Sequence, residues 1–199
     1  MLSHYAVHSP LQGKPGKVKD YEQIPLEKRQ GKPAYAAMVE SIDDSVGRVM
    51  GTLRRLELED NTLVIFTSDN GGFAKATSNS PLRANKGSNY EGGIRVPIAI
   101  KWPSKYPSGV TFEKNISSLD FFATIIEAAN IDYSKKKDLD GIDLTPCITQ
   151  SNCDALNRFL YFRDFDKGWK VVLSPHSVKI ISHQNNNSIV NKNEKIEKF

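Results

Sequence analysis

The sequence has few cysteines, no long apolar run and no dense cluster of basic residues. Cys147 and Cys153 are too few for a disulfide framework or a zinc-binding pattern, although they could pair across a short loop. No apolar stretch approaches the roughly 20 residues of a membrane-spanning helix, so no membrane partner is expected. The net charge is only +4 and the Lys and Arg residues are scattered, which argues against nucleic acid as a partner. The first ten residues, MLSHYAVHSP, lack the basic and apolar regions of a signal peptide.

The residues that are present describe an ordinary globular chain. It has 199 residues, of which 39% are apolar and 25% charged, and this length is enough for a sizeable core. A helix is predicted from Pro33 onwards, because apolar residues recur at spacings of three and four from Tyr35 to Leu56. Asp43 and Asp44 lie within this helix, where neighbouring side chains point about 100° apart, so they are not interpreted as a metal site.

Two further segments predict the strands of an α/β layer. Residues 63–67 are apolar without alternation, as in a parallel sheet that helices cover on both faces. Residues 94–102 predict a second strand, in which Pro97 indicates an edge position or a late start at Ile98. Residues 117–129 predict a helix with Ser117 as its N-terminal cap and a stop at Asn130.

The ends of the chain give weaker signals. Residues 2–7 predict a short strand, and residues 9–31, rich in Pro, Gly, Lys and Gln, predict a loop. Short apolar segments at 160–162, 169–173 and 178–181 predict a small antiparallel sheet. We therefore expect a first domain over residues 1–146, a small β region over 147–183 and a disordered polar tail over 184–199.

The stretch TLVIFTSDNGG, residues 62–72, places Asp69 and Asn70 at the end of a predicted strand. Ligands of open α/β sheets bind beyond the carboxyl ends of the strands. A carboxylate and an amide carbonyl are oxygen ligands that suit Ca²⁺ or Mg²⁺. Taken alone, Asp-Asn-Gly-Gly is more typical of a simple turn.

Several motifs in order carry a family resemblance. The SDNGG turn is followed by LRANKGSNYEGGIRVP at residues 82–97, and the N-terminal YAVHSPLQ, the helix YAAMVESIDDSVGRVM and the later DLDGIDLTP add to the pattern. Together these segments resemble the sulfatases of the alkaline-phosphatase-like superfamily, from about Leu2 to Pro146. The resemblance implies an α/β fold with a partial alkaline-phosphatase-like sheet flanked by helices, followed by the small C-terminal β region.

The resemblance also implies roles for four residues. Asp69 and Asn70 match ligands of a divalent cation, usually Ca²⁺, with Mg²⁺ as the alternative. Lys86 matches a lysine that contacts the sulfate group, and His8 a histidine that contacts it and protonates the leaving alcohol. Cleavage of a sulfate ester builds negative charge on its oxygens, which a cation, an ammonium group and an imidazole would stabilise. Glu91 and Arg95, inside the same motif, are expected to form a buried pair.

The nucleophile motif of the family, C-x-P-S-R or S-x-P-S-R, does not occur in this sequence. Its Cys or Ser becomes a formylglycine, so that cofactor is expected only in a missing N-terminal part. We therefore expect a C-terminal fragment of a sulfatase, inactive alone, or a chain whose missing half is a separate polypeptide. The family is often periplasmic, secreted or lysosomal.

The parent reaction implied is hydrolysis of a sulfate ester, with a sulfated small molecule or glycan as the substrate. Two alternatives remain open. One is a phosphodiesterase or phosphoglycerol transferase of the same superfamily, which has a different nucleophile. The other is a non-catalytic binder of sulfated glycans, which needs only positive charge and a pocket.

Overall fold

A computed structural model of the chain divides it into two compact units, residues 1–100 and 101–199. The sequence pattern predicts domain divisions after residues 146 and 183. The structure describes every residue except 135–137, 151, 165–167, 177–178, 184–185, 191–195 and 199. Within the described ranges, each helix is too short or too polar to cross a lipid bilayer.

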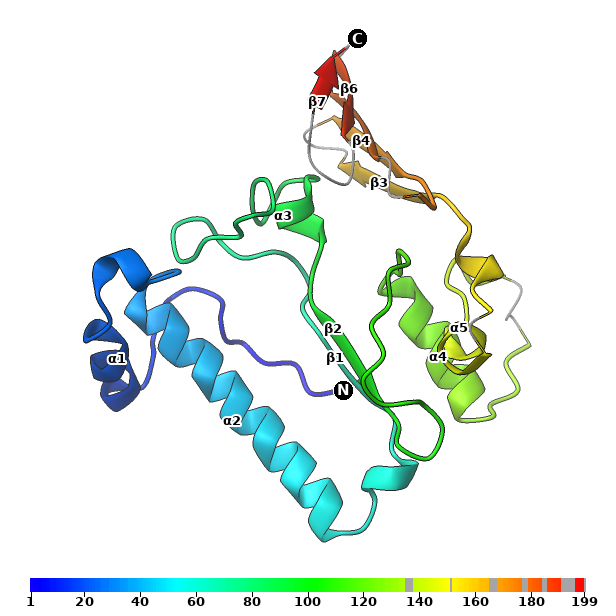
Figure 1. The fold of residues 1–199 in the computed structure, drawn as a ribbon, viewed down its shortest axis with the longest axis horizontal. Coiled ribbons are helices and arrows are strands. Elements are labelled where there is room, and N and C mark those ends of the chain that lie inside the picture. The colour runs from blue at the N-terminus through cyan, green and yellow to red at the C-terminus, as the bar shows by residue number, and fades with distance from the viewer. Residues whose placement is uncertain are drawn as a thin grey trace. The chain divides into compact units, whose positions relative to one another are not determined.

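The first unit combines helices with one short pair of strands (Figure 1). Its elements are α1 (Pro15–Glu22), η1 (Leu26–Lys28), α2 (Pro33–Arg55), η2 (Glu59–Asn61), β1 (Val64–Thr67), α3 (Glu91–Ile94) and β2 (Ile98–Lys101). The helix predicted from Pro33 is confirmed, as is the strand that ends at Thr67. β2 begins at Ile98, the later of its two predicted starts, because Pro97 has no N–H for a strand ladder.

α1 lies against α2 and is held there by charge (Figure 1). The ammonium group of Lys17 forms ion pairs with Glu40 and, at 2.9 Å, with Asp44. These two acidic residues stand four positions apart on one face of α2, so one lysine reaches both. Asp44 of the pair Asp43–Asp44 is therefore an ion-pair partner of α1.

The N-terminal predictions are wrong in two places. Residues 2–7 form no strand, and the predicted loop over residues 9–31 contains both α1 and η1. α1 begins with Pro15, which is tolerated where helix N–H groups have no partner, and its contacts to α2 come from residues far along the chain. Among the described residues the sheet of this unit has two strands, in the order β1–β2.

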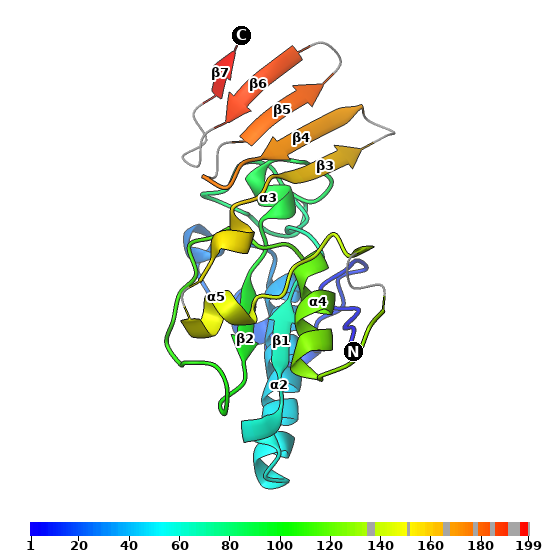
Figure 2. The same cartoon turned by 90° about the vertical axis from the view of Figure 1, so that its right-hand side faces the viewer.

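The second unit joins a helical part to an antiparallel sheet (Figure 2). Its elements are α4 (Leu119–Ala128), α5 (Thr145–Gln150), η4 (Asp154–Leu156), β3 (Leu160–Asp164), β4 (Trp169–Leu173), β5 (Lys179–His183), β6 (Asn186–Val190) and β7 (Ile196–Lys198). The sheet order is β3-β4-β5-β6-β7, and each neighbouring pair is antiparallel. The predicted small antiparallel region is thus confirmed, and so is the mixed α/β class.

The polar tail and the two cysteines both take part in the second unit. β6 and β7 lie within residues 184–199, the range predicted to be a disordered tail; the backbone of β6 pairs with β5, and that of β7 pairs with β6. Cys147 and Cys153 form a disulfide bond across a six-residue separation, which is the pairing that the short loop between them allows. The buried apolar side chains of this unit include those of Ile126, Leu144 and Val171.

Candidate functional site

The turn after β1 presents the two predicted cation ligands. The hydroxyl of Ser68 donates a hydrogen bond of 2.9 Å to the backbone carbonyl of Asn70 and closes the turn. The side-chain amide nitrogen of Asn70 donates to the carbonyl of Gly71 at 3.1 Å, which leaves the amide oxygen Oδ1 available as a ligand. Asp69 is exposed, and its carboxylate has no hydrogen-bond or ion-pair partner within the described residues.

The glycines after this turn allow two backbone segments to touch. Gly71 donates its N–H to the carbonyl of Gly93 at 2.9 Å. A Cβ atom placed on Gly71 would overlap the carbonyl oxygen of Gly92, so no larger residue fits there. The double glycine of the turn and the double glycine of YEGG therefore form one contact between the motifs of residues 62–72 and 82–97.

The loop that bears Lys86 is tied to the same turn. The backbone N–H of Lys86 donates to the carbonyl of Gly72 at 3.0 Å. Asn79 holds Gly72 from the other side, since its Oδ1 accepts from the Gly72 N–H and its Nδ2 donates to the Gly72 carbonyl, both at 2.9 Å. A weaker bond of 3.4 Å runs from Asn79 to the carbonyl of Ala84. Lys86 is thus fixed next to the turn of Asp69 by its backbone.

Two further contacts shape this loop. The guanidinium of Arg83 lies 3.9 Å from the centre of the Tyr90 ring, and the carbonyl of Arg83 accepts a bond from Gly92. Glu91 and Arg95 form the expected pair at 3.9 Å, but the Arg95 side chain is 56% exposed. The expectation of a buried pair is therefore wrong, because α3 ends at Ile94 and leaves Arg95 at its exposed end.

His8 lies in a local network of its own. Its Nδ1 stands 2.8 Å from the carbonyl oxygen of Ser9, and a carbonyl accepts only, so Nδ1 carries a proton. The Tyr5 hydroxyl donates to the same oxygen at 2.6 Å, and the two rings meet edge to face at 5.7 Å. The ring is thereby oriented with Nε2 left for a ligand, on an exposed side chain.

The structure therefore joins three of the four predicted residues in one hydrogen-bonded group of loops, and no described hydrogen bond or ion pair links His8 to them. Asn79 and Arg83 are the residues that the sequence reasoning missed. The sequence shows that both lie between the two glycine pairs, but it does not indicate which backbone groups each residue would bond.

The oxygen donors of this turn are of the type that a divalent cation prefers. Asp69 offers a carboxylate and Asn70 an unengaged amide oxygen, both hard ligands, on a turn whose backbone is fixed. The described residues contain no cluster of three or more His, Cys, Asp or Glu side chains arranged to hold a metal ion. The turn thus offers two oxygen donors of the type that a divalent cation prefers.

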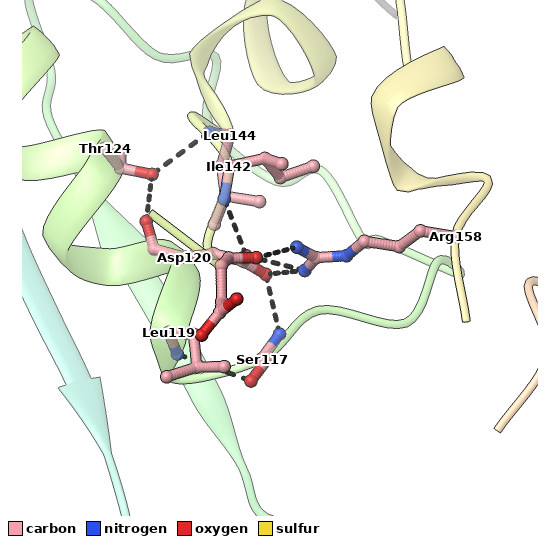
Figure 3. A network of polar contacts seen from close by, with 8 residues as sticks. Ser117, Leu119, Asp120, Thr124, Ile142, Leu144 and Arg158 are labelled. Atoms are coloured by element: carbon pink, nitrogen blue, oxygen red, sulfur yellow. Dashed lines mark hydrogen bonds and ion pairs between the residues drawn. The ribbon is translucent and has the colours of Figure 1, made fainter. Parts of the chain in front are cut away.

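A second polar network lies in the other unit, around the fully buried carboxylate of Asp120 (Figure 3). Both of its oxygens lie 2.6 Å from Nη2 of Arg158. They also accept the backbone N–H groups of Ser117 at 2.7 Å and Ile142 at 3.0 Å. This network joins the start of α4 to segments about 20 and 40 residues later, so its role is to hold the unit together.

Comparison with known proteins places these motifs in a family. The family model "Sulfatase" matches residues 1–131, and the model "N-sulphoglucosamine sulphohydrolase, C-terminal" matches residues 84–185. The chain is 34% identical over 172 residues to a sulfatase of Formosa agariphila, covering 81% of this chain and 31% of that protein. It is 36% identical over 132 residues to N-acetylgalactosamine-6-sulfatase of Sus scrofa, covering 64% and 25%.

The fold agrees with the sequence match. The crystal structure of Ps i-CgsB in complex with k-i-k-neocarrahexaose superimposes with a TM-score of 0.76 and 30% identity, over 98% of this chain and 41% of that one. The fold and the motifs together define an α/β protein of the alkaline-phosphatase-like class. The chain belongs to the sulfatase family. It spans about a quarter to a third of the length of the two curated relatives.

Proposed function

We propose that this chain serves the hydrolysis of sulfate esters, R–O–SO₃⁻, to an alcohol and sulfate, with a sulfated sugar as the substrate. The observation that supports the proposal is the hydrogen bond from the Lys86 backbone to Gly72, because it holds the backbone of this lysine beside the turn that carries Asp69 and Asn70. The names of an N-acetylgalactosamine-6-sulfatase and of a complex with k-i-k-neocarrahexaose among its relatives support a sugar as the carrier of the sulfate.

In this proposal, Lys86 binds the sulfate group and His8 protonates the leaving alcohol. The half-buried ammonium of Lys86, which has no ion-pair partner within the described residues, offers its charge to a sulfate oxygen. The bond from Nδ1 of His8 to Ser9 orients the ring and leaves Nε2 to meet the ester oxygen. In the imidazolium form, Nε2 donates its proton to that oxygen as the S–O bond breaks, so the sugar leaves as a neutral alcohol.

Asp69 and Asn70 would hold the divalent cation, Ca²⁺ or Mg²⁺. When bound, the cation would stabilise negative charge on the sulfate oxygens. A calcium ion takes six to eight oxygen ligands, so two from this chain leave most of the shell to water or to other residues of the complete site. The sequence holds no C-x-P-S-R or S-x-P-S-R motif, so this chain does not supply the formylglycine nucleophile.

A binding measurement tests these assignments without requiring turnover. Titration calorimetry of the full chain with N-acetylgalactosamine 6-sulfate, with and without CaCl₂, should show binding that Ca²⁺ strengthens. Lys86→Gln should weaken it about tenfold, the equivalent of one hydrogen bond to a charged group. Lys105→Gln, an exposed lysine of equal charge, is the matched control.

Two results would count against the proposal. One is equal affinity of the Lys86→Gln and control variants for the sulfated sugar. The other is rapid cleavage of 4-nitrophenyl sulfate by the purified chain with Ca²⁺ alone, which would show that the nucleophile lies within these 199 residues. Replacing the sulfate by the corresponding phosphate ester separates sulfatase from phosphatase specificity.

A further inference from the structure

A shallow groove of about 490 Å³ lies in the first unit, outside the four predicted site residues. It is lined by residues 29–33 and 74–78 together with Leu26. Its two walls are joined like a short antiparallel ladder: Lys32 donates its N–H to Ala76 at 2.8 Å, and Ser78 donates to Gln30 at 3.1 Å. The groove therefore has a backbone that is fixed on both sides.

The charge of this groove has one sign. Three lining side chains, Arg29, Lys32 and Lys75, are cationic, and none of the lining residues is acidic. Arg29 is held in place by bonds of 2.7 and 2.6 Å to the carbonyls of Ile24 and Glu22. The ammonium groups of Lys32 and Lys75 have no ion-pair partner within the part of the chain that the structure describes. Unpaired like charges at one place favour an anionic ligand.

The start of α2 adds to this positive potential. Lys32 is the N-cap of this 23-residue helix, and both Lys32 and Pro33 line the groove. No side chain caps the first turn, so the positive end of the helix dipole lies at two residues that line the groove. Side-chain charge and backbone dipole thus attract the same kind of group.

The groove also adjoins the loops of the proposed sulfate site. Its second wall begins at Ala74, two residues after Gly72, so their Cα atoms lie within about 7 Å of each other. Gly72 accepts the backbone bond of Lys86. The groove therefore lies close along the backbone to the turn that holds Lys86.

We propose that this groove is an anion subsite that binds a second sulfate group, on a neighbouring sugar of the same oligosaccharide. The substrate class is thus a glycan that carries several sulfates. This inference rests on the proposed function, because it uses Lys86 to place the first sulfate. Arg29, Lys32 and Lys75 bind and position the second sulfate and take no part in bond cleavage.

The test compares two ligands and two matched double variants of the full chain. Titration calorimetry with CaCl₂ uses N-acetylgalactosamine 6-sulfate and a tetrasaccharide of chondroitin 6-sulfate. The groove variant is Lys32→Gln with Lys75→Gln. The control variant, Lys19→Gln with Lys105→Gln, removes the same charge at two exposed positions outside the groove. The desulfated tetrasaccharide separates sulfate from carboxylate binding.

The groove variant should bind the sulfated tetrasaccharide about tenfold more weakly than wild type, since each exposed charge contact contributes up to about 1 kcal/mol. Its affinity for the monosaccharide should be unchanged, and the control variant should match wild type for both ligands. An equal loss in groove and control variants, or a loss that persists with the desulfated sugar, would overturn the subsite. If Lys86→Gln binds the monosaccharide as tightly as wild type, both the proposed function and the subsite are refuted. If Lys86→Gln weakens monosaccharide binding but the groove variant binds the tetrasaccharide as tightly as wild type, only the subsite is refuted.

Discussion

Removing the carboxylate of Asp120 should destabilise the second unit more than any exposed acidic substitution. The side chain is fully buried and accepts from Arg158, Ser117 and Ile142 (Figure 3). Asp120→Ala leaves these donors without their acceptor and leaves a cavity where the carboxylate was. Breaking a buried ion pair by removing one partner costs about 3–5 kcal/mol.

The structure indicates the lower end of that range. The Arg158 side chain is 19% exposed, so water can reach part of the guanidinium once its partner is gone. We therefore expect a loss of about 3 kcal/mol in the free energy of unfolding. For a chain of this size, that corresponds to a fall in Tm of about 6–12 °C.

Urea unfolding followed by circular dichroism measures the loss, and Asp132→Ala, an exposed aspartate of the same unit, is the control. Hydrogen exchange adds a local measurement. The amide of Ile142 donates to Asp120, and that of Leu144 to the Thr124 hydroxyl, which itself bonds the Asp120 carbonyl. Both amides should exchange faster in Asp120→Ala. A loss below about 1 kcal/mol, the value of an exposed ion pair, would refute the reasoning.

Three further predictions concern other contacts. Hydrogen bonds to Glu40, the larger effect, and to Asp44 raise the pKa of Lys17 above 10.5. The hydrogen bond from Lys17 in turn lowers the pKa of Asp44 below 3.8. The ion pairs therefore stabilise the fold fully between pH 3.8 and pH 10.5. This stabilisation is lost as pH rises through the Lys17 pKa or falls through the Asp44 pKa. Lys17→Met should therefore flatten the pH dependence of Tm at both the acidic and the alkaline end. Asn79→Ala removes two strong bonds to Gly72 and should weaken sulfated-sugar binding about as much as Lys86→Gln, measured by calorimetry; unchanged binding would show that the loop holds without it. Opening the Cys147 disulfide with a reductant should cost about 2 kcal/mol in urea unfolding, because the loop it closes is short, and an unchanged midpoint would contradict this.

Local sequence patterns were sufficient to predict the elements whose signal lies in neighbouring residues. The spacing of apolar residues predicts α2, and the abrupt end of an apolar run at Ser68 predicts both β1 and the turn that holds Asp69. The stop at Asn130 is also confirmed, since this residue has a φ of 50°, which follows the end of a helix. These features depend on residues within a few positions of each other.

The elements that the sequence pattern did not predict depend on contacts with residues distant in the chain. α1 has no buried residue and a weak pattern of its own, yet Lys17 finds acidic partners on α2. The polar segments of β6 and β7 carry little strand signal, and their order comes from backbone bonds to neighbouring strands. The predicted strand at residues 2–7 has no partner strand among the described residues.

The sequence by itself determined the family motifs, the residue types of the proposed sulfate site and the main helix, because motif order and helical period are properties of the linear chain. Only the tertiary structure decided that Lys86 is bonded to Gly72, that Asn79 holds this turn and that three cations share a groove. Hydrogen bonds and charge between segments depend on backbone approach, which the two glycine pairs permit and which local sequence does not specify.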